Sequence, residues 1–264
     1  MATIVDSLSA ATVEMRAAAT ALQNVEALYR QMVLEKTNAA DQALVKFRQA
    51  STTAYFVDPS GLLGGDDTND GLSNLKPVRT LEKALDLIDL RGASIFGTDV
   101  FLLSDGAVVT RLRGGYSPIS IQGVAWGGGL LGAPYRYVSR SLTFLGEAVN
   151  SPVPGFGRAV ASLVMYAQSI RFQSIDIKIP DAPADLDHRA IIYMVNGGTV
   201  VVGASTISAS TPGTPARLFA ANAPTSFFIT GTVGADAPGK LFLGIPAGVN
   251  PNTSFNYRTN LTSG

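Results

Sequence analysis

The segment from Tyr55 to Ile88 constrains the fold of this chain more than any other. Its residues predict a short strand, a long polar turn and a helix, in that order. Residues 55–57 are aromatic or β-branched, as in strands. The Asp58-Pro59 pair should end the strand, because proline fixes its own φ and keeps the preceding residue extended. Residues 61–71, rich in Gly, Asp and Asn, then predict turns with positive φ and side-chain-to-backbone hydrogen bonds.

A helix is expected to begin after Thr80, whose side chain suits an N-cap. Four apolar residues then share one helical face: Leu81, Ala84, Leu85 and Ile88. The chain that follows predicts strands and no second long helix. A helix placed once, just before a long β region, can cover the open end of a β solenoid, whose first coil would otherwise expose apolar side chains and unpaired backbone groups.

This segment resembles the opening of right-handed parallel β-helix proteins of the pectate-lyase-like superfamily, especially phage tailspike and tail-fibre proteins. Their domains often begin with a strand, an Asp-Pro pair, an Asn-Asp-Gly turn, a Pro-x-x-Thr sequence and a helix. Here the string is carried by Val57, Asp58, Pro59, Asn69, Asp70, Gly71, Pro77, Thr80 and Ala84. The match covers about an eighth of the chain and is a signature of fold, not of catalysis.

The composition excludes some classes of partner. The chain has 264 residues, and its 20 basic and 20 acidic residues give a net charge of zero, so no electrostatic argument favours nucleic acid or an anionic membrane. Only 15% of the residues are charged and 46% are hydrophobic, which suits a rod that buries a central stack and self-associates along its flank. No cysteine is present, so neither disulfides nor thiolate metal sites are expected. The N-terminus predicts no signal peptide, and no apolar run is long enough to span a bilayer.

The first 50 residues predict a helical attachment and oligomerisation segment. From Ile4 to Phe47 there is neither Gly nor Pro. Apolar residues recur at alternating steps of four and three, the heptad pattern of a left-handed coiled coil. The predicted oligomerisation positions are Ile4, Leu8, Met15, Leu22, Val25, Tyr29 and Met32, with alanines at 11 and 18 between them. The alternative is a single amphipathic helix lying on its own domain. Because the alanines bury little apolar surface, we expect a marginal coil that needs a trimeric β domain or a socket on a larger assembly.

The rest of the chain predicts two further regions. Residues 51–91 form a linker, an entry strand and a capping helix, with the polar linker at residues 49–54. Residues 92–264 are predicted to form a β solenoid, because β-rich segments recur about every 23 to 29 residues, a spacing that fits one coil. The resemblance above implies that this solenoid is a right-handed parallel β-helix. The segments are Asp99–Leu103, Pro118–Gly123, Ser141–Gly146, Ile170–Ile179, Gly198–Gly203, Ser226–Gly231 and Ser254–Thr259. An antiparallel sandwich is the alternative, with one candidate hairpin turn at Asn196-Gly197.

The acidic turn, with Asp66, Asp67, Asn69 and Asp70, has the oxygen ligands that calcium prefers. It fails as an EF-hand because Pro77 stands where the bidentate Glu belongs. Hydrogen bonds within the turn explain the same residues, so we expect no metal and no cofactor.

A second acidic group contains Asp176, Asp181, Asp185, Asp187 and the only histidine, His188. Two of these carboxylates could act as acid and base on a glycosidic bond. Prolines at 180 and 183 instead indicate an exposed loop between coils, on which a lone histidine is more often solvated than catalytic.

A basic and aromatic group gives the predicted glycan-binding residues. They are Arg111, Arg113, Tyr116, Trp126, Tyr135, Arg136 and Tyr137, followed by Arg140. Aromatic faces stack on sugar rings, and arginines bind carboxylates or phosphates with two hydrogen bonds. The alternative is a subunit interface, in which Tyr, Trp and Arg are also enriched.

Together with these patterns, the resemblance to phage tailspike and tail-fibre proteins implies a homotrimeric structural fibre or spike on the surface of a phage or phage-like particle. Its N-terminal helix would dock on other virion proteins at the tail, collar or head, and its β-helix would bind host surface polysaccharide without cleaving it. One alternative is a capsule or exopolysaccharide depolymerase that uses two of the four aspartates. The other is a non-binding structural adaptor that carries a distal fibre.

Overall fold

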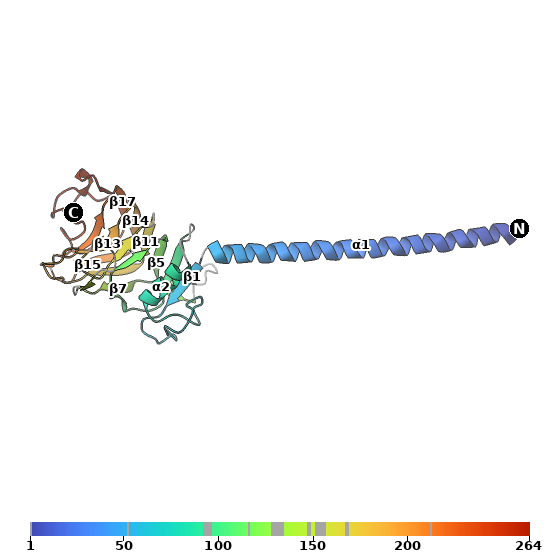
Figure 1. Cartoon of the computed structure of the whole chain (residues 1–264), viewed down its shortest axis with the longest axis horizontal. Coiled ribbons are helices and arrows are strands. Elements are labelled where there is room, and N and C mark those ends of the chain that lie inside the picture. The colour runs from blue at the N-terminus through green and yellow to red at the C-terminus, as the bar shows by residue number, and fades with distance from the viewer. Residues whose placement is uncertain are drawn as a thin grey trace. The chain divides into compact units, whose positions relative to one another are not determined.

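The computed structural model describes residues 2–51, 53–91, 97–115, 117–127, 135–146, 149–150, 157–166, 169–211 and 213–264. The chain divides into two compact units, Met1–Ala50 and Ser51–Gly264. Helix α1 (Ala2–Ser51) makes up the first unit. The second contains helix α2 (Leu81–Arg91), the short 3-10 helix η2 (Pro251–Thr253) and a series of mostly parallel strands (Figure 1).

Helix α1 is long and uninterrupted, as the absence of Gly and Pro predicts. All its side chains from residue 3 to residue 39 are exposed, including the apolar heptad positions, of which Ile4 is 70% exposed. Neither helix α1 nor any other helix in the described residues has an apolar stretch long enough to cross a membrane. The linker predicted at residues 49–54 is wrong, because α1 continues to Ser51 and the first strand begins at Thr53. That stretch contains no Gly or Pro to end the helix earlier.

Three parallel sheets make up most of the second unit. The first contains β1 (Thr53–Val57), β2 (Thr98–Leu102), β5 (Ile119–Trp126), β11 (Ser169–Gln173), β14 (Gly198–Gly203), β17 (Thr225–Ile229) and β19 (Tyr257–Thr259), in that spatial order. The second contains β3 (Ala107–Val109), β7 (Arg140–Phe144), β12 (Ile175–Ile179), β15 (Thr206–Ala209) and β18 (Thr232–Val233). The third contains β4 (Arg113–Gly115), β10 (Leu163–Met165), β13 (Ala190–Met194) and β16 (Arg217–Ala221).

Two antiparallel pairs lie outside this pattern. Strand β6 (Tyr135–Tyr137) pairs with β5, and β8 (Val149–Asn150) pairs with β9 (Arg158–Ala159). The antiparallel sandwich is therefore wrong for the three main sheets. The Asn196-Gly197 turn joins β13 of the third sheet to β14 of the first, so it is not a hairpin turn.

The chain visits the three sheets in a fixed order. Strands β11, β12 and β13 belong to the first, second and third sheet, and β14, β15 and β16 repeat this order. Figure 1 shows β5, β11, β14 and β17 side by side. Residues in register lie about 30 residues apart in sequence, as in the pairing of Ile170 with Val200 and of Val200 with Phe227. The strand segments predicted from the sequence are confirmed in type, with shifted boundaries.

The run predicted as one strand over Ile170–Ile179 is two strands. Ser174 has a φ of 54°, and the chain turns there from β11 of the first sheet into β12 of the second. The same turn recurs one repeat later at Ala204, with a φ of 47°. Neither Ser174 nor Ala204 is a Gly, the residue type that most often marks a positive φ, so the corner at Ser174 was not expected from the sequence.

One hydrophobic core joins the inward faces of the three sheets and α2. In-register residues stack along it, for example Ile121, Phe172 and Val202 of the first sheet. The other two sheets contribute rows of their own, which contain Leu142, Ile177 and Ile207 in one and Leu163, Ile192 and Phe219 in the other. Four aromatic rings, Phe219, Phe227, Phe242 and Tyr257, pack together within this core.

The predicted strand, turn and helix of residues 55–88 are confirmed. The Thr80 hydroxyl accepts a hydrogen bond from the backbone N–H of Lys83 at 3.1 Å, which caps α2. The carboxylate of buried Asp58 accepts hydrogen bonds from the N–H groups of Leu63 and Gly65 and fixes the turn. Burial raises the pKa of Asp58, but hydrogen bonds from the Ser104 and Ser60 hydroxyls, together with these two backbone bonds, lower it overall. In the acidic turn, Asp67 accepts from the N–H of Thr80, at the start of α2.

Replacing Gly123 of β5 with alanine is expected to destabilise the β unit. A Cβ atom there would lie 2.2 Å from the Ser174 carbonyl oxygen and 2.4 Å from that of Val138, and both are backbone atoms. Relieving such overpacking costs about 1–3 kcal/mol, which urea unfolding of the purified protein would measure. The control is Gly213→Ala, where no atom lies within 4 Å of the added Cβ. Equal unfolding midpoints for the two variants would contradict the prediction.

Candidate functional site

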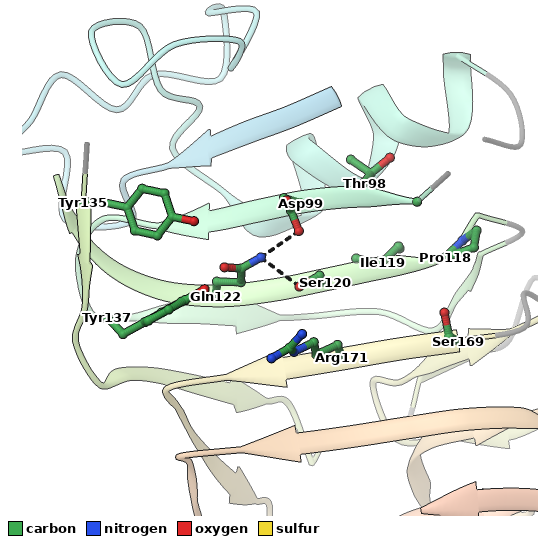
Figure 2. Close-up of a pocket in the computed structure, with 11 residues that line it drawn as sticks. Thr98, Asp99, Pro118, Ile119, Ser120, Gln122, Tyr135, Tyr137, Ser169 and Arg171 are labelled. Atoms are coloured by element: carbon green, nitrogen blue, oxygen red, sulfur yellow. Dashed lines mark hydrogen bonds between the residues drawn. The ribbon is translucent and has the colours of Figure 1, made fainter. Parts of the chain in front are cut away.

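A groove of about 400 Å³ lies on the outward face of the first sheet, and we call it the β5 groove (Figure 2). Strands β2, β5 and β11 provide its floor, and β6 closes one end. Its lining residues are Gly97, Thr98, Asp99, Pro118, Ile119, Ser120, Gln122, Tyr135, Tyr137, Ser169 and Arg171.

Strand alternation puts polar side chains into the β5 groove. Val100 and Ile121 point into the core, so their neighbours Asp99 and Ser120 point outward. Asp99 is in register with Ser120, and Ser120 is in register with Arg171 of β11. Figure 2 shows these side chains in a row across three neighbouring strands. Every second residue of these three strands faces the core. The residues between them form a polar strip that runs across the strands on the solvent side.

A fixed amide lies at the centre of the groove. The Nε2 group of Gln122 donates to Asp99 Oδ1 at 2.6 Å and to Ser120 Oγ at 2.9 Å. Gln122 is only 7% exposed, and its Oε1 atom has no hydrogen-bond partner among the residues that the structure describes. The two bonds of Nε2 hold the amide in this orientation, although a buried carbonyl oxygen without a donor is costly.

Two tyrosines of β6 form the aromatic end of the groove. Pairing with β5 sets them opposite Trp126 and Val124. Tyr135 packs on Phe101, with ring centroids 4.9 Å apart, and stacks with Trp126 at 5.7 Å. Burial, followed by a hydrogen bond with Tyr137, raises the pKa of Tyr135. Tyr137 is 52% exposed and offers its ring and hydroxyl to a bound molecule.

Arg171 gives the groove its positive charge. Its side chain is exposed, and its Nη2 atom donates to Gln173 Oε1 at 3.1 Å. It forms no ion pair with any described residue. The remaining N–H groups of the guanidinium are therefore accessible to acceptors in the groove.

The predicted basic and aromatic residues do not form one surface. Tyr135 and Tyr137 line the β5 groove, and Trp126 lies in the partly buried cluster beside them. Arg136 is exposed on β6 but does not line the groove. Tyr116 lies outside the described residues.

Arg113 has a different role from the predicted one, and exposed Arg111 lies beside the same helix. Arg113 is buried, and its guanidinium contacts Asp86 at 2.7 Å and Asp89 at 2.8 Å on α2. Arg111 pairs with Asp86 at 3.1 Å. Because Asp86 and Asp89 are three residues apart on one helical face, both can reach the strand beside α2. Assigning Arg113 to a ligand surface was wrong, since it holds the helix to the sheet.

Arg140, which followed this group in the sequence, also contacts the protein itself. Its Nη2 atom donates to the Val124 carbonyl oxygen at 3.2 Å, and its Nη1 atom lies 3.6 Å from Asp105. This arginine therefore ties the start of β7 to β5.

The four predicted acidic residues lie in different surroundings, and three of them contact Arg158 or Thr211. Asp176 lies on β12, in register with Ser141 and Thr206. Asp181 accepts a hydrogen bond from Thr211. Asp185 pairs with Arg158 at 2.6 Å, and Asp187 accepts from the N–H of Arg158 at 2.8 Å. The hydrogen bond and charge of Arg158 lower the pKa of Asp185, whereas a general acid needs a raised pKa.

His188 is buried, and the prediction that it is solvated was wrong. It is 8% exposed, and its ring packs edge-on against Tyr193 with centroids 4.8 Å apart. Its backbone pairs with Ala159, so this end of the loop is part of the sheet structure. Burial lowers the pKa of His188 to about 4, although a hydrogen bond with the backbone of Ala190 opposes the shift. The imidazole is therefore neutral near pH 7.

Sequence reasoning missed the polar floor of the groove. Residues 119–122 read Ile-Ser-Ile-Gln, and residues 170–173 read Ile-Arg-Phe-Gln. The structure puts these two stretches in register. Their shared alternation of apolar and polar residues was the available signal, because it marks one solvent-facing side on two neighbouring strands.

Comparison with protein-family models, with curated proteins and with solved structures finds no match for this chain. Among the described residues, no three His, Asp or Glu side chains gather as ligands for a metal ion. The chemistry of the β5 groove, with its tyrosines, amide, carboxylate and guanidinium, is therefore the basis for a functional assignment.

Proposed function

We propose that this protein is a structural fibre or spike protein of a phage or phage-like particle, which binds host cell-surface polysaccharide through the β5 groove. The observation that carries the proposal is the groove itself. It combines an exposed tyrosine face with a hydrogen-bond acceptor on Asp99 and donors on Ser120 and Arg171. Sugars need both kinds of contact, because their rings have an apolar face and their edges carry hydroxyl groups.

We also propose that the second unit is a right-handed parallel β-helix. Support comes from the fixed order in which the chain visits the three sheets and from the repeat of about 30 residues. Parallel strands joined by crossover connections are almost always right-handed. In such a rod, neighbouring strands lie about 4.8 Å apart, so the three strands under the groove offer a row of positions to an extended polymer.

Helix α1 supports attachment and self-association in this proposal. Its apolar heptad positions are exposed over residues 4–32, which suits partner helices. Association as a homotrimer would present three β5 grooves to one surface and strengthen weak sugar contacts through avidity. Docking of the helices on other virion proteins would fix the fibre to its particle.

Both alternative functions have less support. A depolymerase would need two carboxylates free for acid and base chemistry, but Asp185 and Asp187 are held by Arg158 and Asp181 by Thr211. An adaptor that continues the sheet into a distal protein would need a free edge on β19. That edge is covered by the Asn252 side chain, whose Oδ1 accepts from Thr259 N–H at 2.7 Å and whose Nδ2 donates to the Thr259 carbonyl at 3.1 Å.

The test is binding of the intact protein to an array of bacterial surface polysaccharides. We expect binding to a subset of them, with affinity reduced about tenfold in Tyr137→Ala, because one aromatic contact is worth about 1 kcal/mol or more. The matched control is Phe228→Ala. Phe228 is also an exposed aromatic residue on the outward face of the first sheet, but it lies on β17, outside the groove.

Absence of binding to every polysaccharide would refute the proposed function. Equal losses in both variants would refute its assignment to the β5 groove. Shortening of a bound polysaccharide during incubation would show catalysis and favour the depolymerase.

A further inference from the structure

The β5 groove carries opposite charges at the two ends of its row of strands. Asp99 lies on β2, Ser120 on β5 and Arg171 on β11, and the three are in register. With one strand spacing of about 4.8 Å between neighbours, the carboxylate and the guanidinium arise roughly 10 Å apart at the backbone. They form no ion pair with each other. The groove therefore has a negative end and a positive end.

The positive end is suited to an anionic group. Arg171 is exposed, and only its contact with Gln173 Oε1 occupies a guanidinium N–H among the described residues. A guanidinium has five N–H donors in a fixed plane, which matches the two oxygens of a carboxylate. Because Arg171 is exposed, a carboxylate on a polymer can approach it without moving the sheet.

The negative end is suited to hydroxyl groups. The two bonds donated by Gln122 Nε2 hold the side chains of Asp99 and Ser120 in place in the groove. Gln122 donates only to Oδ1 of Asp99, so Oδ2 can accept a further bond in the groove. A carboxylate placed beside Asp99 would be repelled, which fixes the orientation of an acidic ligand.

We infer that the β5 groove recognises an acidic polysaccharide, with a sugar carboxylate bound by Arg171 and a sugar hydroxyl donating to Asp99. The inference rests on the proposed function and adds the chemical class of the glycan. Tyr137, at the end closed by β6, provides the apolar contact for a sugar ring.

The experiment uses bacterial surface polysaccharides printed in pairs, each acidic polymer beside its carboxyl-reduced form. The intact protein is expected to bind native acidic polymers and to lose at least tenfold in affinity when the carboxylates are reduced. Arg171→Gln should lose at least tenfold on the native polymers and show no further loss on the reduced ones. The control, Arg136→Gln, removes an exposed arginine that lies outside the groove, and it should bind like the unaltered protein.

The outcomes separate the two proposals. Equal binding of native and reduced polymers would overturn the acidic ligand and leave the proposed function intact. An equal loss in Arg136→Gln would also overturn it, because binding would then reflect general positive charge. Absence of binding to any polymer would overturn the proposed function and the inference together.

Discussion

Replacing Phe227 with alanine is expected to lower the free energy of unfolding of the β unit by about 4 kcal/mol, because truncating a buried phenylalanine removes apolar contacts and leaves a cavity. Phe227 lies on β17 and is fully buried. Its ring centroid is 5.0 Å from that of Phe219, 5.3 Å from that of Phe242 and 5.7 Å from that of Tyr257. Urea unfolding of the intact protein, followed by circular dichroism of the strands, would measure the loss.

The matched control is the next residue on the same strand. Phe228 has the same side chain but points outward and is 51% exposed. Phe228→Ala should therefore cost less than about 1 kcal/mol, since surface substitutions away from special features have small effects. Similar losses for the two variants would mean that the buried and exposed faces of β17 are assigned wrongly. The assignment of the inward stack and of the outward groove would then be wrong as well.

Features set by neighbouring residues were predictable. The segment around Pro59 and Thr80 combines a chain-stopping proline with a helix cap, and both act within a few residues of their own position. The long α1 followed from a stretch without Gly or Pro. Parallel strands followed from apolar segments at a regular spacing. In each case the physical cause lies inside one element or one repeat.

Features set by contacts between distant residues were not predictable. Arg113 was interpreted as a ligand residue because nothing in its own strand shows that Asp86 and Asp89 face it from α2. Asp99 and Arg171 were missed because they meet only through the registers of β2, β5 and β11. Alternation marks which residues face solvent, but only the register shows which of them lie side by side.

The two faces of the first sheet separate the residues that stabilise the β unit from those of the proposed binding surface. Inward residues, such as Ile121, are held by the stack above and below them. Outward residues, such as Ser120 and Gln122, take no part in that stack. Substitutions in the groove should therefore alter ligand choice with little effect on stability, whereas those in the stack should unfold the unit.

The second large effect is a loss of stability at acidic pH that depends on His188. Its pKa is about 4 in the folded protein, and an unfolded chain would restore it to about 6.5. Between these values the unfolded chain binds one more proton than the folded chain, so the free energy of unfolding falls as pH falls. The contribution is complete above pH 6.5 and lost below pH 4. At about 1.4 kcal/mol per pKa unit, it amounts to about 3 kcal/mol.

His188→Gln isolates this contribution, because glutamine keeps a polar side chain but does not titrate. The difference in unfolding free energy between the unaltered protein and the variant should shrink by about 3 kcal/mol from pH 7 to pH 4, measured by urea unfolding at each pH. Taking the difference removes the acid sensitivity that both proteins share through carboxylates such as Asp58. A difference that is the same at both pH values would show that His188 is solvated in the folded state. The loop that contains it would then be open, and the acidic residues at 181, 185 and 187 would again be candidates for catalysis.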